Sequence, residues 1–439
     1  MVSMFAMSLY SIAEGIFIGQ KLGEAAFAAV NIAFPVILIN FSLSDLVGVG
    51  SSVPISIALG RAQDARANNV FSCSLLLILF SSLLMGALMF FAAEPLARFM
   101  GADEGLLDSS ARYIRTYALC SPFTAIFFAM DNYLRISGYV KQSMYINIFC
   151  NLLTLSLLAF FLIGLEMDVV GSALAACIAI GLCSLAALLP FLRGKTLLRF
   201  VKPRFSLLML KEILSCGSPV FLSNIAGRLT SIIMNVVLIR LGLEALGPGG
   251  GTTAVAAYGV LMYASDMCQP LIYGMSDSLS PAIGFNWGSG DYGRVYTLAK
   301  YNFRGSFLLG LAAAALMFFG AELLTALFVD AEDLSLQILT TRALRFFSVS
   351  YLLRWFSITA QSFLCAIERP MMATGLAVGV ALLFPLLVLW FLWGLGLDGI
   401  WLNLFGSSLL AFLLGALFLG LVRRELRRKR SLRLLYPEG

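Results

Sequence analysis

The chain has 439 residues, of which 60% are apolar and only 12% are charged, and its formal net charge is +6. Soluble globular domains carry about 25% charged residues, so this composition excludes a water-soluble enzyme, a disordered protein and a nucleic-acid-binding protein. The sequence contains no histidine, which removes the usual general base, the commonest zinc ligand and the Ser-His-Asp triad. A polytopic α-helical membrane protein remains, with room for about twelve spans.

Apolar runs separated by charged residues, glycine and proline predict the first spans. Six fall in the first half, at 1–19, 27–59, 69–93, 108–135, 142–165 and 169–192. No basic residue precedes Lys21 and no small-residue cleavage site follows the first run, so it is not a typical signal peptide. The first run begins part-way into a helix, and we expect an N-terminal extension that this chain lacks.

A basic stretch at 193–207 predicts a cytoplasmic linker, and six more spans follow it. They are at 208–240, 254–287, 296–320, 335–366, 371–396 and 399–422, with a basic tail at 423–439. The runs at 27–59 and 254–287 exceed the thickness of a bilayer. Each contains two prolines, which remove backbone hydrogen bonds and allow these helices to tilt or bend.

The distribution of basic residues predicts the orientation. With the N-terminus in the cytoplasm, 21 of the 30 basic residues fall in cytoplasmic segments. The positive-inside rule therefore predicts a multi-pass protein of the plasma membrane with both termini in the cytoplasm. The tail is interpreted as a topology anchor, with a contact to anionic lipid as the alternative. The eight cysteines form no CxxC pair and are interpreted as packing residues.

The two halves of the sequence resemble each other. AAFAAVNIAF (25–34) aligns with TAVAAYGVLM (253–262), and ARYIRTYALC (111–120) aligns with TRALRFFSVS (341–350). Because each half has six predicted spans, the halves share an orientation and should be related by a pseudo-twofold axis along the membrane normal. We expect an all-α fold with two six-helix lobes, 1–192 and 208–422, that enclose a cavity and rock to give alternating access. The sequence shows no symmetric pore-loop signature of a channel.

Four segments carry a resemblance to a known family. They are SIAEGIFIGQKLGEAAFAAV (11–30), NYLRISGYVK (132–141), VGSALAA (170–176) and PLIYGMSDSLSPAIGFNWGSGDYGRV (270–295). In order and spacing they resemble the multidrug and toxic compound extrusion (MATE) family, in its bacterial MepA-like branch. The resemblance implies twelve transmembrane helices in two lobes. It also implies export of organic cations or amphipathic drugs driven by inward protons or sodium, without covalent chemistry, a cofactor or a bound metal other than a transported sodium ion.

Charged side chains at bilayer depth cost about 2.5–3.5 kcal/mol on insertion scales, so those that occur are functional candidates. Seven are placed at bilayer depth by the predicted spans: Glu14, Asp45, Asp131, Arg228, Asp266, Asp277 and Arg354. Glu14 stands where the family has its coupling carboxylate, usually an aspartate. A carboxylate there can bind sodium or take up a proton.

In the family, an asparagine, a second aspartate and a threonine complete this cation site. Asn151 retains the asparagine, whereas Leu155 and Ala176 stand at the other two positions. Two of the four family positions are therefore lost, which favours a proton on Glu14 over a complete sodium cage. Protons and sodium both stay open as the coupling ion.

The remaining aspartates are candidates for a substrate cavity. Asp45, Asp131, Asp266 and Asp277 could attract cationic substrates, and the last two lie three turns apart on one helix face. The alternative for Asp131 is a salt bridge with Arg135, one turn later. Arg228 and Arg354 are expected to neutralise buried aspartates.

The expected partners are cationic or amphipathic small molecules and membrane lipids, with no nucleic acid, and the protein is expected to be a monomer. The sequence favours drug export over three other functions. A lipid-linked oligosaccharide flippase of the same superfamily would carry more cationic residues in its cavity. A membrane enzyme would show a clustered polar motif, and a cation channel would not need the two-lobe repeat.

Overall fold

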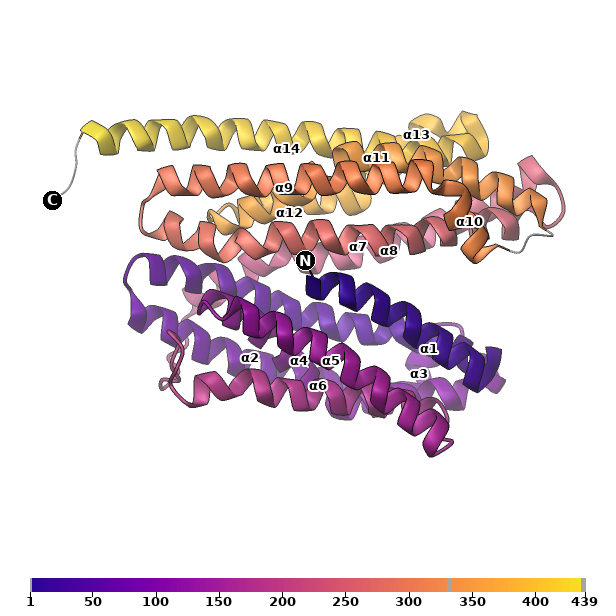
Figure 1. The fold of residues 1–439 in the computed structure, drawn as a ribbon, viewed down its shortest axis with the longest axis horizontal. Helices are drawn as coiled ribbons and strands as arrows, with labels where there is room; N and C mark the ends of the chain where they lie inside the picture. Colours follow the sequence, from indigo (N-terminus) through magenta and orange to yellow (C-terminus); the bar gives the residue numbers. More distant parts are fainter. Residues whose placement is uncertain (1, 330–332, 436–439) are drawn as a thin grey trace. The chain divides into compact units, whose positions relative to one another are not determined.

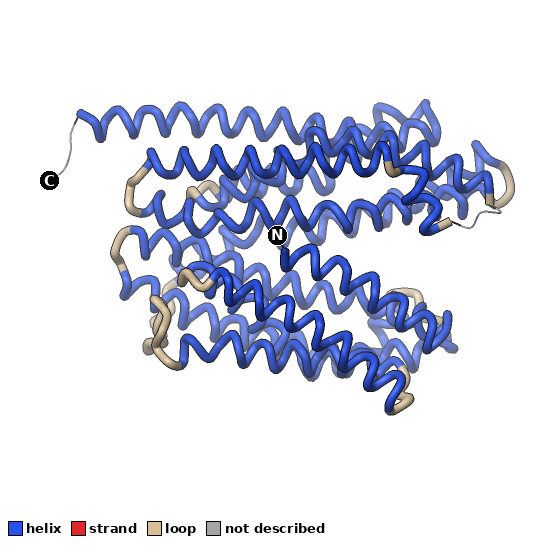
Figure 2. The backbone as a smooth tube through the Cα atoms, viewed as in Figure 1, coloured by secondary structure: helices blue, strands red, loops and turns tan. Residues whose placement is uncertain are grey.

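In this computed structural model the backbone is described for residues 2–329 and 333–435. Many side chains before residue 28 and all those after residue 425 lie outside the description, and with them most of the predicted basic tail. The described residues form helices joined by short turns and contain no strand (Figure 2). The predicted all-α fold is confirmed, and the chain divides into two compact units, Val2–Phe221 and Leu222–Gly439.

The first unit contains the helices that correspond to the first six predicted spans. They are α1 (Val2–Gly60), α2 (Asp64–Phe91), the short α3 (Ala93–Phe99), α4 (Glu104–Ile136), α5 (Val140–Ala159) with a π-helical turn (Phe160–Gly164), α6 (Val169–Leu192), and the beginning of α7 (Leu207–Leu246). The 59 residues of α1 would measure about 90 Å if straight, about three times the hydrocarbon thickness. Figure 1 shows instead that α1 folds back on itself, so it accounts for two predicted spans.

The second unit contains the remainder of α7 and the helices of the last predicted spans. They are α8 (Gly250–Gly288), α9 (Tyr292–Phe319), the short α10 (Ala321–Phe328), α11 (Leu334–Ala366), α12 (Pro370–Val378) with a π-helical turn (Gly379–Leu383), α13 (Phe384–Leu392) with a 3₁₀ turn (Trp393–Leu395), and α14 (Gly396–Leu435). Together α12 and α13 account for the predicted span 371–396. The short helices α3 and α10 were not predicted, and each directly follows the helix of the third predicted span of its half.

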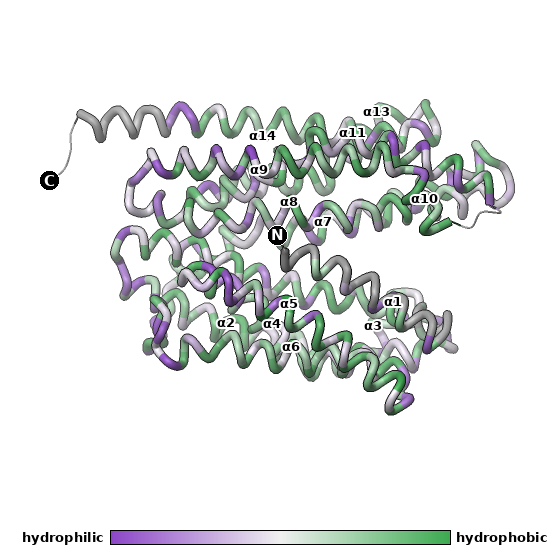
Figure 3. Tube along the Cα trace, in the orientation of Figure 1, coloured by the Kyte–Doolittle hydropathy of each residue, from purple (hydrophilic) through white to green (hydrophobic). Residues whose placement is uncertain are grey.

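Apolar composition and length agree with a membrane location. Within the described residues, seven segments are long and apolar enough to cross a bilayer: Ala28–Gly60, Asp64–Phe91, Val140–Gly164, Val169–Leu192, Leu207–Leu246, Tyr292–Phe319 and Pro370–Glu425. Figure 3 shows that most strongly hydrophilic residues lie near helix ends and turns. The helices α4, α8 and α11 are long but are not among these segments, and they carry Asp131, Asp266, Asp277 and Arg354.

Ion pairs repeat at equivalent positions in the two units. Arg112 of α4 pairs with the residue that caps α6, and Arg342 of α11 pairs with a residue in the first turn of α14. Arg115 and Arg345 pair with the short helices α3 and α10. The pairs are Arg112–Asp168 (2.8 Å), Arg342–Asp398 (2.9 Å), Arg115–Glu94 (2.7 Å) and Arg345–Glu322 (2.8 Å). The sequence repeat therefore extends to tertiary contacts.

Two glycines allow α1 and the beginning of α7 to approach closely. A Cβ atom on Gly217 would lie 1.9 Å from the carbonyl oxygen of Leu46, and one on Gly50 would lie 2.3 Å from the carbonyl oxygen of Ile213. Both neighbours are backbone atoms, which cannot move aside without displacing a helix. The contact requires glycine on both sides.

We expect Gly217→Ala to destabilise the protein by about 1–3 kcal/mol, because the added methyl group forces α1 and α7 apart. Gly227→Ala is the matched control in the same helix, since a Cβ there meets no atom within 4 Å and alanine is the better helix former. Thermal unfolding of the purified protein in detergent checks both. Equal melting temperatures for the two variants would contradict the close approach.

Candidate functional site

Glu14 lies in the part of α1 that corresponds to the first predicted span, and its side chain is half-buried. Tyr10, one turn earlier in the same helix, donates a side-chain hydrogen bond to the Glu14 carboxylate. The spacing of four residues places both side chains on one helix face. The carboxylate therefore has a local donor within its own helix.

Three other helices of the first unit complete the surroundings of Glu14. Tyr113 and Tyr117 of α4 interact electrostatically with Glu14, and their ring centroids lie 5.3 Å apart. Tyr113 also forms a hydrogen bond with Ser172 of α6, and Cys150 of α5 lies close to Tyr10. The described neighbours of this carboxylate are thus mainly hydroxyl groups.

The predicted partners of Glu14 on α5 and α6 contribute less to this site. Asn151 is half-buried on α5, and among the described residues no hydrogen bond joins it to Glu14. The hydroxyl of the neighbouring Thr154 donates to the backbone carbonyl of Cys150 at 2.8 Å. Leu155 packs in an apolar cluster with Phe17, and Ala176 is buried. The role of Asn151 in ion coupling stays a prediction.

Sequence reasoning missed Tyr10, Tyr113 and Tyr117. The signal for Tyr10 was its position one turn before Glu14. The signal for Tyr113 and Tyr117 was a difference between the two halves, because the aligned positions in the second half are Ala343 and Phe347. Two tyrosines that only one half carries could have been recognised as specific to that half.

Asp131 is held in a buried polar network at the cytoplasmic end predicted for α4. Arg135, one turn later, donates to its carboxylate, as the alternative interpretation predicted. Ser143 Oγ (2.5 Å) and Asn147 Nδ2 (2.6 Å) of α5 donate to Asp131 Oδ1. Four side chains thus connect α4 to α5, and the Asp131 carboxylate accepts hydrogen bonds from both helices.

In the second unit, Asp266 lies near two arginines. Arg228 of α7 and Arg354 of α11 both interact electrostatically with the Asp266 carboxylate, and the Arg354 guanidinium lies 5.9 Å from the centroid of the Tyr351 ring. Asp266 and Arg228 are exposed although both lie midway along long helices. A charged side chain exposed at that depth faces water rather than lipid, so these residues mark a hydrated wall of the unit.

The structure also describes the other two candidate aspartates. Asp277, further along α8, is half-buried and accepts a hydrogen bond from Ser362 of α11 at 2.9 Å. Asp45 is half-buried in α1 of the first unit. Among the described residues, no three Cys, Asp or Glu side chains gather into a group that could hold a metal ion.

Comparisons with known proteins agree with the resemblance in the sequence. The MatE family model matches residues 1–160 and 219–391. The multidrug export protein MepA of Staphylococcus saprophyticus is 27% identical over 311 residues, which cover 68% of this chain and 65% of that protein. MepA of Staphylococcus aureus strain MRSA252 is 25% identical over 308 residues, covering 68% and 65%. The chain therefore matches slightly less than two thirds of the length of these relatives.

Solved structures support the same fold. An outward-facing MATE multidrug resistance transporter of the MOP superfamily has a TM-score of 0.87 at 23% identity, covering 98% of this chain and 94% of that one. A MOP superfamily transporter from Pyrococcus furiosus has a TM-score of 0.84 at 24% identity, covering 98% and 94%, and is described as having a binding pocket of reverse polarity that suggests a different function.

These structural likenesses confirm the predicted fold of twelve helices in two lobes. The family model extends over most of both halves of the chain, and family members are transporters rather than enzymes, as the sequence predicted. The chain belongs to the MatE family.

Proposed function

We propose that this protein is a secondary active exporter of organic cations or amphipathic drugs in the plasma membrane, driven by inward proton flow. Its relatives are named multidrug export proteins, which supports the substrate class. The single observation that carries the ion assignment is the carboxyl group of Glu14, placed among tyrosine hydroxyls within the membrane part of α1. Gain or loss of one proton there changes the charge of the site and shifts the balance between conformations.

The neighbours of Glu14 support a proton over sodium. A sodium ion needs several oxygen ligands, and Leu155 and Ala176 supply no side-chain oxygen at two of the expected positions. A proton needs only the carboxyl group itself and a hydrogen-bond partner such as Tyr10.

We further propose that substrate binding and release alternate between the two sides of the membrane as the lobes 1–192 and 208–422 rock, with the monomer as the working unit and both termini in the cytoplasm. The basic segments 193–207 and 423–439 support this orientation. Asp45, Asp266 and Asp277 are the proposed attractors for cationic substrates, while Asp131 is assigned to structure.

A second candidate is transport of substrates with an anionic group, including the lipid-linked oligosaccharides of a flippase. The specific observation is the pair Arg228 and Arg354, which lies close to Asp266. The Asp266 carboxylate offsets part of the positive charge of the two arginines, so this site attracts an anion less strongly than a cavity lined by arginines alone. We therefore prefer the cation exporter.

The test is ethidium transport by the purified protein in lipid vesicles, with proton and sodium gradients imposed separately. We expect transport under the proton gradient in sodium-free buffer. Transport that needs sodium would refute the proton assignment. Transport of an anionic dye but not of ethidium would favour the second candidate.

A further inference from the structure

The linker 193–207 connects α6 to α7, and both helices are long and apolar enough to cross a bilayer. Because each of these helices has an end at the linker, the linker lies at one surface of the membrane. It contains no carboxylate side chain, since no Asp or Glu occurs between Asp168 and Glu212. Its basic residues are all exposed and are Arg193, Lys195, Arg199, Lys202 and Arg204.

Side chains of α2 hold the backbone of this linker in place. Asn69 bonds both backbone polar groups of Arg204, because its Nδ2 donates to the carbonyl oxygen at 2.9 Å and its Oδ1 accepts from the N–H at 2.8 Å. Two further bonds of this kind are from Arg199 N to Asn68 Oδ1 (2.8 Å) and from Val201 N to Ser72 Oγ (3.0 Å). The linker contributes only backbone atoms to these bonds, so its basic side chains remain exposed.

Apolar side chains lie beside these basic residues. Phe200 packs on Phe71 of α2, with ring centroids 5.2 Å apart, which fixes the middle of the linker. Phe205 and the first residues of α7, Leu207 and Leu208, are instead 56%, 87% and 77% exposed. Exposed apolar residues that adjoin basic residues are typical of a segment at the boundary between lipid headgroups and acyl chains.

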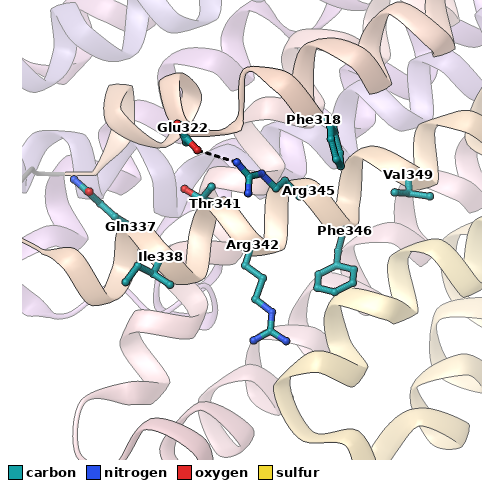
Figure 4. A pocket seen from close by; sticks show the side chains of 9 residues that line it. All are labelled: Phe318, Glu322, Gln337, Ile338, Thr341, Arg342, Arg345, Phe346 and Val349. Carbon is teal, nitrogen blue, oxygen red and sulfur yellow. Dashed lines mark hydrogen bonds and ion pairs between the residues drawn. The ribbon is translucent and has the colours of Figure 1, made fainter.

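The positive charge of the linker is not offset by ion pairs. Among the described residues none of its five basic side chains pairs with a carboxylate, and the adjacent Glu212 is bonded to Arg66 of α2 at 2.9 Å. The pocket at the start of α11 provides a contrast, because Figure 4 shows Arg345 pointing toward Glu322, with which it pairs at 2.8 Å. The linker therefore presents a positive surface that attracts anions.

We propose that the linker 193–207, with the first turn of α7, is a binding surface for anionic phospholipids such as phosphatidylglycerol. The headgroup phosphates accept hydrogen bonds from the arginines and lysines, while Phe205, Leu207 and Leu208 contact the acyl chains. The partner is a lipid rather than an acidic protein, because the surface lies between two membrane-crossing helices. Since α2 already holds the backbone, little conformational entropy is lost when the lipid binds.

The test is native mass spectrometry of the full-length protein in detergent micelles, titrated with phosphatidylglycerol or with phosphatidylcholine. We expect the wild type to bind phosphatidylglycerol at least about a hundredfold more tightly, since each basic residue near an anionic surface contributes about fivefold. The triple variant Arg199→Gln, Lys202→Gln and Arg204→Gln should reduce this preference about a hundredfold. Its binding of phosphatidylcholine should not change.

The matched control removes three basic residues of α9, Arg294→Gln, Lys300→Gln and Arg304→Gln, which are also exposed. Asp291, which caps α9, offsets part of their charge, so this variant should keep the preference for phosphatidylglycerol. Melting temperatures show whether each variant is folded.

Three results would overturn the proposal. The first is equal binding of the two lipids by the wild type, and the second is an equal loss of preference in the two triple variants. The third is displacement of phosphatidylglycerol by millimolar glycerol 3-phosphate, because the surface would then bind a soluble phosphate rather than a lipid.

Discussion

Replacing Glu14 with glutamine is expected to reduce drug export to the level of cells that lack the protein. Glutamine has nearly the same size and can still hydrogen-bond to Tyr10, but it cannot release a proton near neutral pH. The conformational change would therefore lose its coupling to proton entry. Ethidium efflux from intact cells that express equal amounts of each variant measures this effect.

Two variants serve as controls for Glu14→Gln. Tyr10→Phe removes only the hydrogen bond to the carboxylate, and we expect export to fall about tenfold, since a hydrogen bond to a charged group contributes about 1.5–3 kcal/mol. Glu166→Gln neutralises an exposed carboxylate in the turn before α6 and should leave export unchanged. Wild-type efflux by Glu14→Gln would refute the assignment of Glu14 as the coupling group.

The second large effect is expected for Asp131→Asn, which should destabilise the protein by about 3–5 kcal/mol. The Arg135 and Asp131 side chains are only 18% and 11% exposed, so removing the carboxylate charge leaves a guanidinium without its counter-ion in a poorly hydrated site. The hydrogen bonds from Ser143 and Asn147 weaken with it. We expect the melting temperature in detergent to fall by roughly 10 °C.

Glu244→Gln is the matched control for Asp131→Asn. The pair Arg240–Glu244 has the same spacing of four residues, but its side chains are 68% and 59% exposed. Exposed pairs contribute about 0–1 kcal/mol, so the melting temperature should change little. Equal shifts for Asp131→Asn and Glu244→Gln would show that the network around Asp131 does not stabilise the fold.

The sequence predicted the long helices well, because hydropathy and turn residues are local signals. Span 169–192 coincides with α6, and span 335–366 differs from α11 by one residue. The helix α14 continues to Leu435, beyond the predicted end of the last span at 422. The hydropathy of the sequence indicates where a helix leaves the membrane. Arginine, lysine and leucine are good helix formers, so the helix continues beyond that point.

Contacts within one helix were also predictable, whereas contacts between helices were not. The pairing of Asp131 with Arg135 follows from their spacing of one turn. The donors Ser143 and Asn147 come from the next helix, and the approach of Tyr113 and Tyr117 to Glu14 depends on how α1 folds back beside α4. Such neighbours are set by the packing of distant segments, for which a single sequence contains no direct signal.

Exchange of a proton on Glu14 for the exported drug should be visible as proton movement without an imposed ion gradient. Vesicles that contain the protein and a pH-sensitive dye receive a gradient of ethidium in sodium-free buffer. We expect ethidium flow to drive protons in the opposite direction with the wild type and to drive none with Glu14→Gln. Ethidium flow without proton movement in the wild type, or equal proton movement in both, would contradict it.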